Sequence, residues 1–218
     1  LLSLGHALFF SAGMYAMGLP IWHLGWLPLP ALILGLLAGG ALAGAAGLLA
    51  LRTAGVSFMI VTLMFAQAGH LTLLYLNTWT GGDEGFVVPL AARELLGADL
   101  STDAPRYMTA LALFAVALLV CLWLVRSPFG RVMVAMRENE ERSRMLGYNP
   151  FRVKLIALVV SGLYAGIAGA AYGLLFGYVG ATFSTIQYSI LPMLYVLMGG
   201  AGTVLGPFLG ALAMFYLI

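Results

Sequence analysis

Few side chains in this sequence have the types and spacing that catalysis needs. The chain has one cysteine, Cys121. It lacks the G-x-x-x-x-G-K-[ST] pattern that holds nucleotide phosphates and the H-E-x-x-H pattern that holds zinc. No pair of carboxylates lies within an apolar stretch. We therefore expect no catalytic residue, no metal site and no cofactor in this chain.

Two histidines, His6 and His70, lie within long apolar stretches, and Gln67 precedes His70 by three residues. An ionisable side chain inside a membrane is a candidate for function by default. We therefore interpret His6, Gln67 and His70 as candidate residues of a transport pathway. The alternative is that each histidine is neutral and bonds to a neighbouring helix.

The composition explains why these stretches should lie in a membrane. Hydrophobic residues make up 62% of the 218 positions, charged residues only 8%, and the mean hydropathy is +1.02. A soluble domain has about 25% charged residues. A soluble enzyme, a disordered tail and a nucleic-acid binder are therefore excluded. The composition predicts an all-α, polytopic bundle of transmembrane helices.

The stretches without charged residues are long enough for about six or seven membrane spans. A helix needs about 20 apolar residues to cross about 30 Å of hydrocarbon. Both ends of the chain fall within apolar segments, so we expect residues 1–218 to be one transmembrane domain, truncated at both ends. The first segment lacks the basic start and the cleavage site of a signal peptide. The expected spans are residues 4–19, 27–51, 56–76, 107–125 and 155–178, the short stretch 186–198, and a last one starting at 203.

Charge asymmetry predicts the orientation. The loop 126–154 holds seven Lys or Arg residues, whereas the loop 77–106 holds two Arg residues and five acids. Because cytoplasmic loops carry an excess of Lys and Arg, loop 126–154 should be cytoplasmic and loop 77–106 external. His23 should lie in a short external turn.

The basic loop has the pattern of amphipathic helix. Ser127 and Pro128 form a typical helix start, and Gly147 suits a helix end. One apolar face is predicted, which bears Phe129, Val132, Met133 and Met136. One or two helices should therefore cover about 20 residues. Such a segment can lie on the membrane surface or dock into a groove on a partner protein, or it can serve only as a topology anchor.

Small residues recur at helical spacing in two spans. Gly39, Ala43 and Gly47 form one stripe, and Gly162, Gly166 and Gly169 form another. Lipid offers helices no hydrophobic reason to associate, so small residues that let backbones approach closely must do it. The stripes predict tight helix packing.

The short apolar stretch 186–198 contains Pro192 and runs into glycines. It predicts a broken or re-entrant helix, a form tolerated where it lines a cavity or is covered by protein. The alternative is a short tilted helix with a flexible turn. The expected hinge consists of Gly199, Gly200, Gly202 and Pro207.

The external loop opens with a run of turn residues, Thr80, Gly81, Gly82, Asp83, Glu84 and Gly85. Residues 87–97 are expected to form a short surface helix. The loop can be a docking surface for a substrate-binding protein or a solvated connector.

Four stretches, in order along nearly the whole chain, resemble the LivM-type permease subunits of branched-chain amino-acid ABC importers. The family's first helix resembles residues 2–10 (LSLGHALFF), and its external glycine motif resembles 80–86 (TGGDEGF). Its glycine turn resembles 199–207 (GGAGTVLGP). The strongest likeness is in the basic loop, at 127–131 (SPFGR), 136–142 (MRENEER) and 146–154 (LGYNPFRVK).

The resemblance implies that the basic loop is the coupling helix, which sits in a cleft of an ATPase subunit. Glu141 and Gly147 occupy the acid and glycine positions of the family's motif, whereas Arg142 and Ser143 stand where small residues are common. The residues expected to contact the ATPase are Arg131, Arg137, Glu138, Glu141, Arg142 and Gly147. The implied partners are ATPase subunits that bind ATP and Mg, a second permease subunit, a substrate-binding protein and membrane lipid, with no nucleic acid.

The expected function is therefore import of branched-chain or other aliphatic amino acids across a bacterial inner membrane by alternating access. Three alternatives remain open. They are a permease of the same architecture for urea or short amides, a motor-independent channel or secondary carrier, and a membrane subunit that transports nothing. The absence of acids from the spans disfavours ion coupling.

Overall fold

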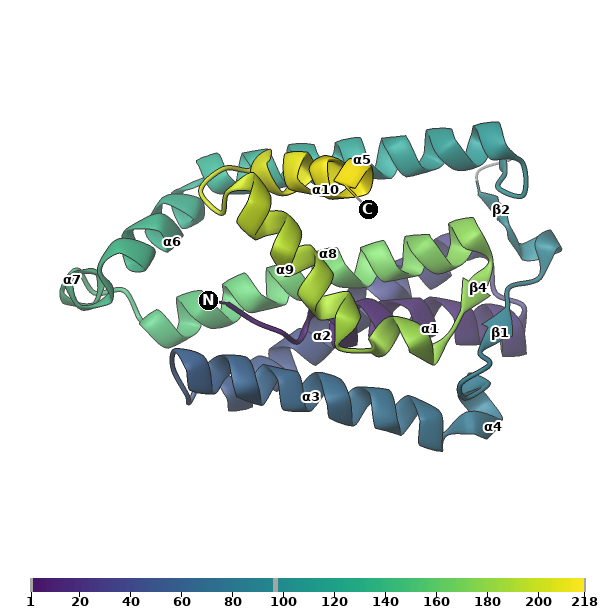
Figure 1. Cartoon of the computed structure of the whole chain (residues 1–218), viewed down its shortest axis with the longest axis horizontal. Helices are drawn as coiled ribbons and strands as arrows, with labels where there is room; N and C mark the ends of the chain where they lie inside the picture. The colour runs from purple at the N-terminus through teal and green to yellow at the C-terminus, as the bar shows by residue number, and fades with distance from the viewer. Residues whose placement is uncertain (1, 96–97, 218) are drawn as a thin grey trace.

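A computed structural model describes residues 2–95 and 98–217. It is mostly helical and confirms the expected polytopic helical architecture (Figure 1). Within these described residues, five helices are long and apolar enough to cross a membrane, which makes the chain a multi-pass membrane protein by length and composition. They are α1 (His6–Leu24), α2 (Pro28–Ala50), α3 (Val56–Tyr75), α5 (Asp103–Arg126) and α8 (Pro150–Phe176).

The last two expected segments form shorter helices. Helix α9 (Gln187–Gly199) has 13 residues and α10 (Gly206–Leu217) has 12. At 1.5 Å per residue each is about 20 Å long, less than the hydrocarbon thickness. They pack as a hairpin, because a Cβ at Gly210 would lie 1.9 Å from the Tyr195 carbonyl oxygen. Helix α10 also reaches α5, where the rings of Phe208 and Phe114 are 5.2 Å apart.

Helices α1, α2 and α8 form the tightly packed centre (Figure 1). A Cβ at Gly39 would lie 2.5 Å from the carbonyl oxygen of Gly162 and 2.6 Å from Cα of Gly166. A Cβ at Gly13 would lie 2.1 Å from the Gly166 carbonyl oxygen. The two predicted stripes of small residues therefore face each other, and the expectation of tight packing is confirmed.

The basic loop forms two helices, α6 (Pro128–Glu138) and α7 (Glu140–Met145). The Ser127 hydroxyl accepts a hydrogen bond from the Gly130 amide at 3.2 Å, as the cap prediction requires. Asn139 separates the helices, and its side chain accepts from the Arg142 amide at 2.9 Å. Gly147 has a positive φ of 89° after α7. Helix α8 begins at Pro150, so the last part of the predicted loop is already helical.

The segment between α3 and α5 differs from the prediction. It contains α4 (Asn77–Thr80), the strands β1 (Phe86–Val87), β2 (Glu94–Leu95) and β3 (Ala98–Asp99), and the 3-10 turn η1 (Leu90–Ala92). The prediction of a helix over 87–97 is wrong for residues 87–95. Residues 96–97 are not among those that the structure describes. Tertiary pairing explains the error, because β1 pairs with β4 (Tyr178–Val179), which follows α8.

The remaining described element is the 3-10 turn η2 (Ala181–Ser184), which precedes α9. Helix α1 continues beyond the expected end of the first span and passes through Pro20. His23 therefore lies in the last turn of α1 and not in a connecting turn. Residues 126–154 and 77–106 lie at opposite ends of the bundle (Figure 1). We name these the basic end and the acidic end.

Candidate transport pathway and coupling site

A cavity of about 970 Å³ lies near the basic end, between residues 2–6, the α2–α3 turn, α6 and α8. His6 lies at its inner part: Nδ1 donates to the Ser3 carbonyl at 3.3 Å, and Nε2 accepts from the Ser161 hydroxyl at 2.7 Å. Ser161 is seven residues beyond Lys154 on α8, which places it about 10 Å deeper along the helix axis. The charged lining residues are Arg52, Arg137, Glu140 and Lys154.

The other two candidate pathway residues lie elsewhere. His70 Nδ1 donates to Ser184 Oγ at 2.7 Å, and the Ser184 hydroxyl donates to the Ala181 carbonyl at 2.6 Å. Gln67 is exposed on α3 and does not line this cavity. The structure therefore places His6 and His70 in separate environments, and Gln67 in neither.

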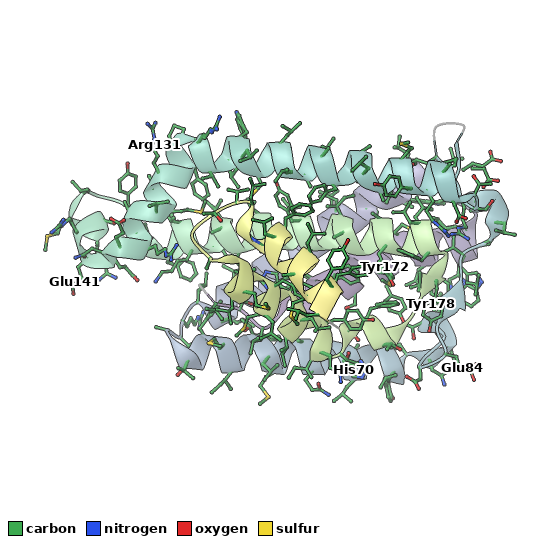
Figure 2. All side chains as sticks on the ribbon, turned by 45° about the horizontal axis from the view of Figure 1, so that its top comes forward. His70, Glu84, Arg131, Glu141, Tyr172 and Tyr178 are labelled. Carbon is green, nitrogen blue, oxygen red and sulfur yellow. The ribbon has the colours of Figure 1, made fainter. Side chains whose placement is uncertain are left out.

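The basic loop turns its predicted apolar face inward. Met136 is buried, and Met133 and Met136 line the cavity. The charged side chains proposed to contact a partner are exposed instead (Figure 2). They are Arg131, Glu138, Glu141 and Arg142, with Gly147 exposed after α7. Arg137 is exposed as well, but it also lines the cavity. The apolar face packs on the chain's own helices, which leaves the charged faces of α6 and α7 open to a partner.

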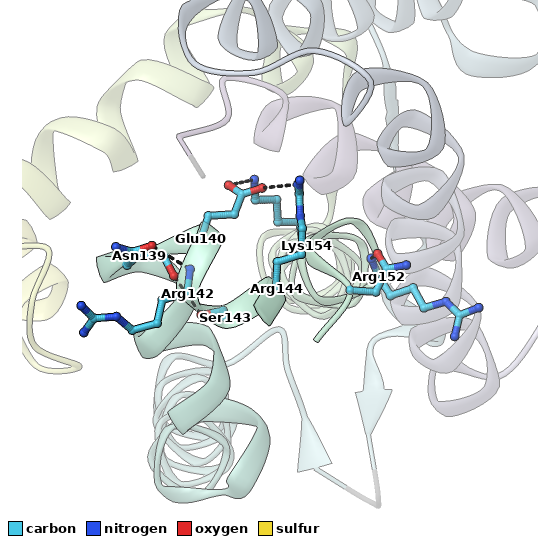
Figure 3. Close-up of polar contacts among 8 residues, drawn as sticks. Asn139, Glu140, Arg142, Ser143, Arg144, Arg152 and Lys154 are labelled. Carbon is cyan, nitrogen blue, oxygen red and sulfur yellow. Dashed lines mark hydrogen bonds and ion pairs between the residues drawn. The ribbon is translucent and has the colours of Figure 1, made fainter. Parts of the chain in front are cut away.

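An ion pair ties α7 to α8 (Figure 3). Lys154 Nζ lies 2.5 Å from Glu140 Oε2, and Arg144 lies 3.9 Å from Glu140 Oε1. Figure 3 shows the Arg142 side chain pointing away from this cluster. Sequence reasoning missed Glu140, because two adjacent acids give no sign of which one turns inward.

At the acidic end, the glycine motif is a backbone structure that exposes two acids. Gly81, Gly82 and Gly85 all have positive φ, which favours glycine. The buried Thr80 hydroxyl donates to the Leu73 carbonyl at 2.7 Å. Asp83 and Glu84 are exposed, the latter at the end of the molecule opposite Arg131 and Glu141 (Figure 2).

A model of the family "branched-chain amino acid transport system / permease component" matches residues 1–217. The chain belongs to this permease family. It is 31% identical to the high-affinity branched-chain amino acid transport system permease protein LivM of Escherichia coli K12, over 98% of this chain and 56% of that protein. A probable LivM of Methanocaldococcus jannaschii is 30% identical over 70% of this chain and 44% of its own length.

More distant similarity links the permease to a different import system. The autoinducer 2 import system permease protein LsrC of Photorhabdus laumondii is 32% identical over 45% of this chain and 32% of its own length. The chain spans about half the length of the LivM proteins it matches. No solved structure shows a significant match.

The permease also has a buried arginine, Arg93, that the sequence analysis counted only as a loop charge. Arg93, which is 8% exposed, reaches from the loop to the end of α8. Its Nε donates to the Leu174 carbonyl at 3.2 Å and its Nη2 to the Leu175 carbonyl at 2.5 Å. The last carbonyls of a helix lack intrahelical partners and carry partial negative charge. Arg93 therefore fixes the acidic-end loop to α8.

Replacing Arg93 with methionine is expected to destabilise the permease by about 2 kcal/mol, because charged hydrogen bonds to buried carbonyls are lost. The measurement is thermal unfolding of the purified protein in detergent. Arg106→Met is the control, since Arg106 pairs with an exposed Asp103 side chain. An equal effect of the two substitutions would refute the capping role of Arg93.

One carboxylate at the acidic end has a shifted pKa. Hydrogen bonds from Ser101, including its amide at 2.8 Å, hold the pKa of Asp99 below its ordinary value.

The expected hinge residues lie between α9 and α10. Gly199 packs against Gly206, and Gly200 has a φ of 92°. Gly202 has open space around it, and Pro207 lies in the first turn of α10.

Proposed function

We propose that the chain is the membrane-spanning part of an ATP-driven importer of branched-chain amino acids that works by alternating access. Residues 126–154 face the cytoplasm and 77–106 the outside of a bacterial inner membrane. The observation that carries the proposal is how the two faces of the basic loop, which we propose as the coupling loop, are buried or exposed. Its apolar face is already packed internally, and its charged face is free at the end richest in Lys and Arg.

The partners follow from the two ends. ATPase subunits, which bind ATP and Mg, dock on the exposed charges of α6 and α7. A substrate-binding protein docks on the acidic end, where Asp83 and Glu84 are exposed. A second permease subunit packs against this one within the membrane. The names of the relatives, which describe permeases of amino-acid transport systems, support this assembly.

The cavity supplies the mechanical link. Met133, Met136 and Arg137 of α6 line the same cavity as His6 and Ser161. A displacement of α6 by an ATPase therefore changes the shape of the cavity directly. We propose that this cavity is the cytoplasmic end of the pathway and that His6 lines it.

The charges of the cavity favour an amino acid over urea. Three cations, Arg52, Arg137 and Lys154, and one carboxylate, Glu140, line it. A carboxylate of a zwitterion gains Coulomb attraction there that a neutral amide does not. The apolar remainder of the lining, such as Leu51, Phe58 and Leu158, suits an aliphatic side chain.

Replacing Glu141 with lysine is expected to abolish most ATP-driven leucine uptake and co-purification of the ATPase, while the chain still inserts. Glu141 is exposed on the proposed docking face, and the substitution reverses its charge. The assay uses the full-length permease with its ATPases, second permease and binding protein in liposomes, with labelled leucine and labelled urea.

Glu94→Lys is the matched control, because it makes the same charge change on an exposed residue at the acidic end. It should leave ATPase co-purification intact. Normal co-purification and uptake by the Glu141→Lys protein would refute the docking assignment. ATP-dependent uptake of urea and not leucine would change the substrate, and uptake without partners would refute the ATP-driven mechanism.

A further inference from the structure

We propose that Phe183 is the external gate of the transport pathway and that the glycine motif at 80–85 controls it. The inference rests on the proposed function, because "external" denotes the acidic end in the proposed orientation. It assigns a role in transport to an aromatic cluster around Phe183 and to the segment between α8 and α9.

Phe183, in η2, is the centre of an aromatic cluster whose other rings come from four further elements. It is 7% exposed, and its ring centroid lies 5.0 Å from that of Tyr172 on α8 and 5.1 Å from that of Tyr188 on α9. Phe10 on α1 and Tyr178 on β4 lie at 6.3 and 6.0 Å. Rings at these separations and tilts attract one another, so the four neighbouring rings hold Phe183 in place.

The cluster stands in line with the cavity. Phe10 follows His6 by four residues on α1, and residues so spaced share one helix face. Tyr172 follows Ser161 by eleven residues on α8, which places it about 16 Å further along the axis. His6 and Ser161 mark the inner part of the cavity. The Phe183 cluster therefore lies on the external side of the cavity, further along the same helices.

Phe183 lies on irregular backbone and not within a long helix. The segment from Gly177 to Thr185 links α8 to α9 and contains only a two-residue strand and a 3-10 turn. His70, which is bonded to Ser184 of this segment, lies five residues before the end of α3, or about 7.5 Å from it. Irregular backbone at such a depth is tolerated where protein covers it, and Ser184 is fully buried.

The glycine motif is attached directly to this segment. The Tyr178 hydroxyl donates to the Glu84 carbonyl at 3.0 Å, and Phe86 pairs with Val179 in the β1–β4 ladder. A Cβ at Gly85 would lie 2.2 Å from the Val179 carbonyl oxygen. Figure 2 shows Glu84, Tyr178 and Tyr172 in sequence from the acidic end toward the middle of the bundle.

A rigid connection follows from these contacts. A binding protein that displaces Asp83 or Glu84 moves residues 178–180 with them, because strand pairing and the Tyr178 bond hold the two segments together. Phe183 is three residues further along the same segment. Its withdrawal from Tyr172 and Phe10 would open the external side while the binding protein is docked.

The test is substrate leakage through a Phe183→Ala variant of the full-length permease, reconstituted with its ATPases and second permease in liposomes. Without ATP or binding protein, we expect labelled leucine to leak at least about tenfold faster than through the wild type, a barrier change of about 1.4 kcal/mol. Phe208→Ala is the matched control, because Phe208 pairs with Phe114 and not with the cluster. A Phe183→Ala assembly that leaks leucine no faster than the wild type would overturn the proposal that Phe183 is a gate.

A second measurement does not depend on the substrate. In a Cys121→Ala background, the Ser184→Cys variant is treated from outside with a membrane-impermeant maleimide. We expect slow labelling, which Phe183→Ala accelerates, and which docking of the binding protein also accelerates. Labelling at one rate in all three conditions would overturn the proposal. If the wild type moves no leucine with ATP, the proposed function fails, while the labelling rates still decide whether Phe183 closes the external side.

Discussion

Replacing Gly39 with alanine is expected to lower the thermal unfolding midpoint of the permease by ~5–10 °C. The new Cβ would lie 2.5 Å from the Gly162 carbonyl oxygen and 2.6 Å from Gly166 Cα, and both are backbone atoms that no rotamer change can move. Helices α2 and α8 must separate to admit it. Overpacking of this kind costs about 1–3 kcal/mol, and separation also weakens the contacts of α1 with both helices.

The same helix provides a matched control. Gly44 lies five residues further along α2, and a Cβ there would meet Val159 Cγ2 at 3.4 Å, an ordinary contact. Gly44→Ala should therefore leave the midpoint unchanged or raise it slightly, because alanine favours a helix interior over glycine by about 1 kcal/mol. Thermal unfolding of both proteins in detergent tests the difference. Equal midpoints would show that α2 and α8 do not pack as closely as described.

Helix packing was predictable as a property, but the packing partners were not. Spacing of three to four residues placed Gly39 and Gly166 on helix faces built for close contact. It did not indicate that Gly39 meets Gly166, or that Gly13 of α1 meets the same residue. Those pairings depend on how three helices cross, which no local pattern contains.

Helix ends were predictable where a local residue closes them, by a side-chain hydrogen bond or by a positive φ. Ser127 and Gly147 do what their positions predict. The break at Asn139 also had a signal, because Asn followed by two acids is a typical helix start. The helix expected over 87–97 failed for the opposite reason. Its first residue, Val87, pairs with Tyr178 of β4, and its Arg93 is held by the end of α8. These contacts come from about 90 and about 80 residues away in sequence.

For the candidate site too, the sequence indicated some residues but not their contacts. Residue type and apolar surroundings singled out His6 and His70, but their hydrogen-bond partners Ser161 and Ser184 are far away in sequence. The pathway role of the histidines stays a prediction. Phe183 carried no signal at all, because an aromatic residue in an apolar segment is ordinary. Its position among the other rings is a property of the fold.

Replacing Glu140 with lysine is expected to abolish most ATP-driven uptake while the ATPase still binds. Glu140 faces Lys154 across the gap between α7 and α8, with 2.5 Å between Oε2 and Nζ, and lysine there would place two cations together. Helix α7 would then lose this ion pair to α8, whose residues Leu158 and Ser161 line the cavity. Lys154→Glu should have the same effect, since it opposes two carboxylates.

The charge-swapped double variant, Glu140→Lys with Lys154→Glu, separates this coupling from folding. It restores opposite charges at the same place, so it should recover most of the uptake lost by either single variant. An ion pair this exposed contributes only about 0.2–1 kcal/mol to stability, so we expect both single variants to remain folded. Co-purification of the ATPase with Glu140→Lys, and not with Glu141→Lys, would show that adjacent acids serve different tasks. Glu140 would transmit movement within the permease, and Glu141 would bind the ATPase. Full uptake by Glu140→Lys, or no recovery in the double variant, would refute the link through α8.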